Sequence, residues 1–346
     1  MNNNPFSIAF GKKPYQYIER ELIYDEIMND LNAEIIQNQC FMLSGVRGSG
    51  KTVTMTNIEN RLRDSKDWIV IGLNVERNML ESLVAKLYDT NKLKKGFWDA
   101  SINLSTFGIG AVVKNIPPVA DIESALEIML KEIKKQGKRL LVTVDEVFNS
   151  KTVREFASTF QIMIRQDLPI FLLMAGLYEN IHSLEDEKNL TFLYRAPKYH
   201  MTPLSPMLIK QSYKTILGVS EDVAEEMADL TKGYPFAYQA LGKYVWESEK
   251  KSITDDVIIK YDNALEMYSY NKIWDEMSEM DRFYMSFIVK KEEMKTSELL
   301  ERSGKNKNEF SQYKTRLSEK GVIDTSKRGI ITVPLPRFRE FVERKI

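Results

Sequence analysis

The chain has 346 residues, enough for one large domain or two ordinary ones, and its 43% hydrophobic content supplies material for a core. Lys and Arg together number 49, as do Asp and Glu, so no net charge draws the protein toward nucleic acid or a membrane surface. The single cysteine, Cys40, excludes an internal disulfide framework, and the two histidines add too few ligands for a typical zinc site.

The N-terminal sequence and the lengths of the apolar runs predict a cytoplasmic protein. The first 16 residues show no basic stretch followed by an apolar run, which a secretory signal requires. No apolar run approaches the roughly 18 residues that a membrane-spanning helix needs. We therefore expect no membrane partner.

Strands and helices alternate through the first half of the chain. Near-continuous apolar runs predict buried strands at 40–44, 67–75, 139–147 and 168–177. Periodic apolar residues predict helices at 51–63, 78–89, 121–138 and 152–166, the third with Asp121 as its N-cap and Gly137 at its end. This order predicts an α/β fold with a parallel sheet covered by helices on both faces. The glycine-punctuated stretch 101–117 predicts an inserted hairpin, either packed on this domain or facing a partner or DNA.

After Pro203 the pattern becomes helical. Helical stretches continue to about residue 272 and predict a helical lid with a connecting helix. Beyond them, helices are predicted at 279–291, 295–304 and 306–321, followed by a basic hairpin at 322–334. The order of helix, helix-turn-helix and hairpin predicts a winged helix-turn-helix.

A glycine-rich loop follows the first predicted strand. Residues 45–52 are GVRGSGKT and fit the pattern G-x-x-x-x-G-K-[ST]. In such loops backbone N–H groups surround phosphates, the lysine reaches the terminal phosphates and the hydroxyl binds Mg²⁺. A helix N-terminus after the loop also favours anions. The sequence therefore predicts a P-loop nucleotide site formed by Gly45, Val46, Arg47, Gly48, Ser49, Gly50, Lys51, Thr52 and Val53, with Thr52 on the metal.

An acidic pair closes the apolar run LLVTVDEV. Asp145 is expected to support the Mg²⁺ shell at a strand end, and Glu146 to polarise an attacking water. The alternative for Asp145, taken alone, is a helix cap. Downstream of a P-loop, the pair instead predicts a metal-dependent hydrolase, because an aspartate by itself would suffice for metal binding.

The expected nucleotide is ATP. A guanine-reading N-K-x-D motif should follow a later core strand, yet FLLMAGL is followed by YENIHSLEDEK. The sequence NKNE at 306–309 shares some of these letters but lies in the C-terminal helical region. We therefore expect ATP and Mg²⁺ as the bound cofactors.

These motifs together resemble the AAA+ ATPases with an origin-recognition-like module. The resemblance is strongest to a bacterial group that joins an ATPase core, a helical lid and a C-terminal winged helix. That group is related to archaeal initiator ATPases and to the signalling ATPases called STAND. The resemblance covers nearly the whole chain and is carried by PYQYIERELIYDEI (14–27), the P-loop, VTVDEV, MAGLYENI, FLYRAPKYHMTPLS (192–205) and GYPFAYQALGKYVW (233–246).

The resemblance implies further site residues. It places the segment that holds Tyr17, Ile18 and Arg20 over the adenine, although Glu19 stands where glycine is usual. It implies that Gly233 and Pro235 bring the lid to the nucleotide. Arg195 matches an arginine that serves as a finger or a sensor, and its alternative role is a surface salt bridge. Many relatives carry a polar sensor at the end of the fourth strand, where this chain has Met-Ala-Gly (174–176), which argues against fast hydrolysis.

The C-terminal region is basic. Residues 295–346 contain 13 Lys and Arg but 7 Asp and Glu, which favours an anionic partner. Winged helices usually place the third helix in a DNA major groove and the hairpin on the backbone. The candidate contacts to duplex DNA are Lys305, Lys307, Asn308, Gln312, Lys314, Arg316, Lys327 and Arg328. The alternatives are a protein-contact module and a simply solvated face.

The sequence predicts three parts: an ATPase core (1–205), a helical lid with a connecting helix (206–272) and a winged helix-turn-helix (273–346). Two functional hypotheses follow. The first is an ATP-hydrolysing switch coupled to a module that binds DNA or a partner. The second is a slow or inactive nucleotide-binding regulator that assembles with a protein partner, as signalling or defence ATPases do, without binding DNA. A homo-oligomer is a further candidate partner. The intact acidic pair and the basic hairpin favour the first, and the missing polar sensor favours the second.

Overall fold

A computed structural model describes residues 3–9, 14–90, 104–109, 119 and 121–346. The chain divides into two compact units. The sheet unit comprises residues 20–44 and 51–200, and the helical unit comprises residues 1–19, 45–50 and 201–346. The loop 45–50 thus belongs by its contacts to the helical unit, although it lies in sequence between two elements of the sheet unit. The finer three-part division stays a prediction.

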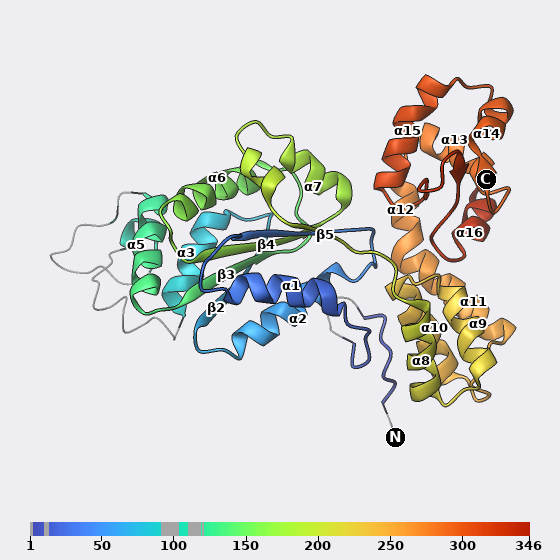
Figure 1. Cartoon of the computed structure of the whole chain (residues 1–346), viewed down its shortest axis with the longest axis horizontal. Helices are drawn as coiled ribbons and strands as arrows, with labels where there is room; N and C mark the ends of the chain where they lie inside the picture. Colours follow the sequence, from blue (N-terminus) through green and yellow to red (C-terminus); the bar gives the residue numbers. More distant parts are fainter. Residues whose placement is uncertain (1–2, 10–13, 91–103, 110–118, 120) are drawn as a thin grey trace. The chain divides into compact units, whose positions relative to one another are not determined.

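The described part of the sheet unit contains a five-stranded parallel sheet in the order β2-β3-β4-β1-β5 (Figure 1). Its strands are β1 (Cys40–Ser44), β2 (Trp68–Leu73), β3 (Arg139–Val144), β4 (Ile170–Gly176) and β5 (Lys198–His200). The predicted parallel α/β sheet is confirmed. Because all five strands are parallel, their carboxyl ends lie at one edge.

Helices flank this sheet on both faces. They are α1 (Glu21–Asn32), α2 (Lys51–Arg63), α3 (Met79–Asp89), α5 (Ile122–Lys135), α6 (Lys151–Arg165) and α7 (Tyr178–Glu185), with 3-10 turns η1 (Ser105–Phe107) and η2 (Thr191–Arg195). Asp121 caps α5 as predicted, since its carboxylate accepts a bond from the Ser124 N–H at 2.8 Å. Of the hairpin predicted at 101–117, only 104–109 are described and contain η1; the rest lies outside the described residues.

Alternate residues of each strand pack on opposite faces of the sheet. Cys40 and Met42 of β1 join the core formed with α3, α5, α6 and α7. Phe41 and Leu43, also fully buried, point to the other face, where α1 and α2 lie (Figure 1). This two-sided burial explains the near-continuous apolar runs from which the strands were predicted.

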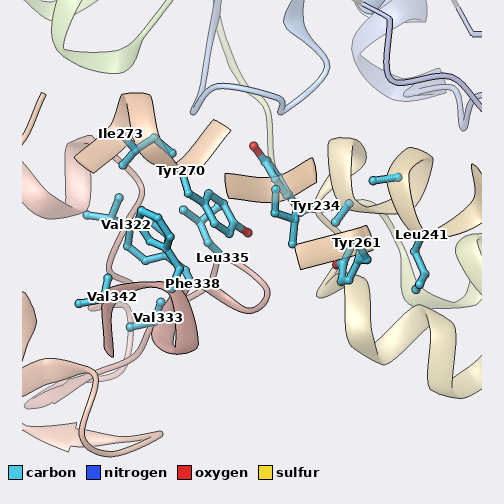
Figure 2. Close-up of a cluster of buried hydrophobic side chains, with 14 of the residues drawn as sticks. Tyr234, Leu241, Tyr261, Tyr270, Ile273, Val322, Val333, Leu335, Phe338 and Val342 are labelled. Carbon is cyan, nitrogen blue, oxygen red and sulfur yellow. The ribbon is translucent and has the colours of Figure 1, made fainter. Parts of the chain in front are cut away.

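The helical unit is built on a core of its own. Its elements are α8 (Pro206–Leu217), α9 (Glu221–Thr231), α10 (Pro235–Glu247), α11 (Asp255–Leu265), the π turn η3 (Glu266–Tyr270), α12 (Asn271–Asp275), α13 (Glu279–Ile288), β6 (Met294–Lys295), α14 (Thr296–Ser303), α15 (Lys307–Glu319), β7 (Ile330–Ile331) and α16 (Phe338–Lys345). One hydrophobic cluster runs from Ile209 in α8 to Val342 in α16. Figure 2 shows its middle, where Tyr270 meets Phe338 edge to face at 4.9 Å. The C-terminal helices therefore share a core with the preceding ones.

None of the helices in the described ranges combines the length and apolar character needed to cross a bilayer.

Burial should protect the single thiol from chemical modification. Cys40 is 6% exposed, and burial raises its pKa to about 12, so roughly one thiol in 10,000 is ionised at pH 8. We expect an aromatic disulfide reagent to leave the folded protein unmodified at pH 8 while the guanidinium-unfolded chain reacts completely. The absorbance of the released thiolate measures both. Rapid stoichiometric labelling of the folded protein would contradict the packing of β1.

Candidate functional site

The loop between β1 and α2 has a backbone that favours glycine at two positions. Gly48 and Gly50 have φ of 72° and 93°, in the left-handed region that most side chains avoid. Within the loop the Ser49 N–H donates to the Val46 carbonyl at 3.2 Å. The loop leads directly into Lys51, the first residue of α2. A glycine loop followed by a helix N-terminus suits an anion such as a phosphate.

The start of α10 meets this loop inside the helical unit. A Cβ on Gly48 would lie 2.4 Å from the Tyr234 hydroxyl oxygen, and one on Gly50 would lie 3.8 Å from the Pro235 ring. The N–H of Phe236 donates to the Gly48 carbonyl at 3.1 Å. Gly233, with a φ of 74°, forms the turn that leads into α10. The structure thus places the two predicted lid residues, Gly233 and Pro235, in the segment that contacts the predicted phosphate loop.

The predicted metal-binding pair is preassembled in the sheet unit. Thr52 lies in the first turn of α2, and its hydroxyl donates to a carboxylate oxygen of Asp145 at 2.7 Å. Asp145 directly follows β3 and is half-buried. A hydroxyl and a carboxylate oxygen at this spacing suit Mg²⁺, which prefers oxygen ligands. The described residues offer no cluster of three His, Cys, Asp or Glu, so Mg²⁺ would need phosphate oxygens and water as further ligands.

The predicted base stands in an unusual backbone conformation. Glu146 is exposed and has a φ of 53°, which is rare for a residue other than glycine. Its N–H donates to the other carboxylate oxygen of Asp145 at 2.9 Å, and the next N–H, of Val147, donates to the Ala175 carbonyl at 2.8 Å. These bonds hold the turn after β3. Strained residues of this kind cluster at functional sites.

The end of β4 has a steric reason to lack a polar side chain. A Cβ on Gly176 would lie 2.9 Å from the Val147 carbonyl oxygen and 3.0 Å from its Cγ1. Met174 and Ala175 are buried in the sheet. Glycine at 176 therefore makes room for the chain that follows the acidic pair.

Two contacts at the site were missed from the sequence. The hydroxyl of Ser44, 1% exposed at the end of β1, lies 2.6 Å from Nδ1 of His200 at the end of β5. The Tyr234 hydroxyl donates to the Arg47 carbonyl at 2.5 Å. Neither contact has a local sequence signal, because the partners lie 156 and 187 positions apart in the chain.

The remaining predicted residues are spread over both units. Arg195 is exposed at the end of η2 in the sheet unit. Tyr17 and Ile18 are half-buried in the helical unit, where the Gln239 side chain donates to the Gln16 carbonyl at 2.6 Å. Arg20 precedes α1 in the sheet unit, and burial lowers its pKa. Val53 is half-buried in α2.

Several predicted DNA-contacting cations are paired within the protein. Arg316 bonds Asp281, which is 1% exposed, at 2.6 Å and also reaches the Ser278 hydroxyl at 2.7 Å. Lys305 pairs with Glu309 at 2.7 Å, and Lys327 with Glu293 at 3.0 Å. The candidates that are exposed at the surface are Lys307, Asn308, Gln312 and Arg328, while Lys314 is half-buried.

Two protein families match parts of the sequence. Residues 20–190 match a family described as an ATPase domain predominantly from Archaea, and residues 268–342 match one described as a domain of unknown function. The first comparison supports an ATPase domain but not specifically the bacterial group. No curated protein sequence matches the chain.

Solved structures resemble this chain at low sequence identity. A Walker-type ATPase of Pyrococcus abyssi is 13% identical, covers 94% of this chain and 95% of its own, and has a TM-score of 0.67. Cdc6p of Pyrobaculum aerophilum is 14% identical, with 97% and 96% covered and a TM-score of 0.49. The first likeness and the parallel sheet establish the α/β fold of P-loop ATPases.

The backbone at position 146 should favour glycine over alanine. We expect Glu146→Gly to be more stable than Glu146→Ala by about 0.5–1 kcal/mol, because the left-handed strain of ~1–2 kcal/mol outweighs the chain entropy of glycine. Both variants lose the carboxylate, so their difference isolates the backbone. Urea unfolding measures it. An alanine variant as stable as the glycine variant would show that the turn is unstrained.

Proposed function

We propose that this protein is a Mg²⁺-dependent ATPase that works as a molecular switch. The observation that carries the proposal is the bond between the Thr52 hydroxyl and Asp145, directly after a glycine loop with two left-handed glycines. A hydroxyl at a helix start and a carboxylate at a strand end are what an Mg²⁺ bound to nucleotide phosphates requires. The matching ATPase family and the shared fold support it.

In this proposal each residue has a separate task. Backbone N–H groups of residues 45–53 surround the phosphates, and Lys51 neutralises the terminal ones. Thr52 and Asp145 hold Mg²⁺. Glu146, exposed beside Asp145, takes the proton of the water that attacks the γ-phosphorus, and the bond to the β-phosphate oxygen breaks to give ADP and phosphate.

Turnover is expected to be slow. No polar side chain stands at the end of β4 to help stabilise the transferring phosphoryl group, because Gly176 has no room for one. Arg195, exposed on η2, is the proposed cation for that charge, either within the chain or toward a second copy. Tyr17, Ile18 and Arg20 are proposed to lie at the adenine side, with Gly233 and Pro235 as the lid contact.

The C-terminal residues are proposed to form a winged helix-turn-helix that contacts DNA. The helices α13, α14 and α15 are followed by a chain that returns in β7, which pairs antiparallel with β6. Lys307, Asn308, Gln312 and Arg328 would make the contacts. Arg316 is needed by the buried carboxylate of Asp281, so we assign it to stability rather than to DNA.

A second candidate function is a nucleotide-binding regulator that acts on a protein partner. The ion pairs of Lys305, Lys327 and Arg316 favour it, since they neutralise much of the predicted basic face. Phosphate contacts dominate the affinity for DNA, so a face with few available cations binds it weakly.

Two substitutions separate binding from hydrolysis. We expect Lys51→Ala to weaken ATP binding roughly tenfold or more through the loss of charge-assisted bonds. Glu146→Gln should keep ATP affinity and reduce the rate of hydrolysis by roughly 10²- to 10⁴-fold, because the general base is lost. Calorimetry and phosphate release measure the two effects.

Glu155→Gln, an exposed glutamate of α6, is the matched control for the loss of one carboxylate. Equal ATP affinity of the wild-type protein and Lys51→Ala would overturn the nucleotide site. Unchanged turnover of Glu146→Gln would remove only the assigned base.

Salt dependence distinguishes the two C-terminal roles. If the module binds duplex DNA, the double variant Lys307→Ala/Arg328→Ala should bind less tightly and reduce the salt slope by about 2. Arg316→Ala should instead lower the unfolding midpoint, because Asp281 then stays buried without its cation. Fluorescence anisotropy across salt concentrations gives the slope. Absence of DNA binding at low salt would favour the protein-partner function.

A further inference from the structure

The Tyr234 hydroxyl holds a backbone carbonyl of the phosphate loop. Tyr234 is 4% exposed at the N-cap of α10, and its hydroxyl donates to the Arg47 carbonyl at 2.5 Å. The same oxygen lies 2.8 Å from the Ser269 hydroxyl, which is also buried. A phenol donates one hydrogen bond and accepts another. Tyr234 can therefore donate to Arg47 while Ser269 donates to it. Burial raises the pKa of Tyr234, so the phenol remains a donor at physiological pH.

A bond that fixes the direction of the Arg47 carbonyl also fixes the direction of the Gly48 N–H. In a planar trans peptide the carbonyl of one residue and the N–H of the next point in opposite directions. The Arg47 carbonyl points at Tyr234, so the Gly48 N–H points away from it. Amides that point into the loop are what a phosphate requires. The contact needs glycine at 48, because a Cβ there would lie 2.4 Å from the Tyr234 oxygen.

Ser269 is placed by a rare backbone feature. It lies in the π turn η3 between α11 and α12, and such turns are frequent at functional sites. The next residue, Tyr270, is fully buried against Phe338 and Phe341 (Figure 2). The core of the C-terminal helices thus fixes the position of the hydroxyl that supports Tyr234.

Two side chains of the loop contact residues in the C-terminal part of the helical unit. The Arg47 guanidinium bonds Glu276, just after α12, at 2.9 Å. A Cβ on Gly321, after α15, would lie 2.0 Å from Cγ1 of Val46, so these residues are in close contact. The loop therefore contacts Glu276 and Gly321 through two consecutive side chains, while its backbone is linked to Ser269 through Tyr234.

We propose that Tyr234 is a positioning residue of the phosphate loop, and that Ser269 behind it links the loop's shape to the π turn. The inference rests on the proposed role of the loop as a phosphate site. Tyr234 touches no phosphate; it aims the Gly48 amide. By thermodynamic reciprocity, a nucleotide that requires this loop shape also stabilises the contact with Ser269.

The test is a pair of matched phenol-to-phenyl substitutions. Tyr234→Phe deletes one oxygen and leaves the ring. Tyr238→Phe deletes a similar buried oxygen one turn along α10, 2.6 Å from the Ser212 hydroxyl and away from the loop. Ser269→Ala removes the second partner. Hydrogen exchange of the loop amides is measured without nucleotide, and ATP affinity by calorimetry.

In Tyr234→Phe we expect the loop amides to exchange at least severalfold faster than in the wild-type protein, and the ATP affinity to fall about fivefold. Ser269→Ala should change both quantities in the same direction by a smaller factor. Tyr238→Phe should leave the exchange of the loop amides unchanged. Loop exchange equal to that of wild type in Tyr234→Phe overturns the inference, and so does an equal acceleration of loop exchange in Tyr238→Phe. If wild type and Lys51→Ala both fail to bind ATP, the proposed function fails, yet exchange in the nucleotide-free protein still decides the role of Tyr234.

Discussion

Parallel pairing of β1, β4 and β3 is the constraint on which the candidate catalytic groups depend. It brings the ends of these strands to one edge, so that the first turn of α2 and the turn after β3 can meet. The bond between Thr52 and Asp145 is the direct result. Since β4 lies between the other two, its last residue must also leave room for the turn after β3, and the absence of a side chain at Gly176 provides it.

Much of this arrangement is local and could be predicted. Apolar runs buried on both faces indicated the strands, and the spacing within GVRGSGKT indicated the loop. Two of its glycines, Gly48 and Gly50, have left-handed backbone. Asp145 and Glu146 followed from their place after an apolar strand. The order of the strands in the sheet is a tertiary property that no single run contains.

Contacts between distant residues could not be predicted. Nothing near Tyr234 in the sequence indicates that its hydroxyl reaches Arg47, 187 positions away. The basic face of α15 was predicted from charges along one helix, but the partner of Arg316 is a carboxylate on α13, 35 positions earlier.

The turn that leads into α10 restricts insertions and deletions at this point of the chain. The loop is contacted by Tyr234, Pro235 and Phe236, and Gly233 contacts the backbone of Leu204. An inserted or deleted residue would shift all four contacts. The turn between α8 and α9 differs, since a side chain on Gly218 would meet open space. Related sequences should therefore keep the first turn at constant length and let the second one lengthen.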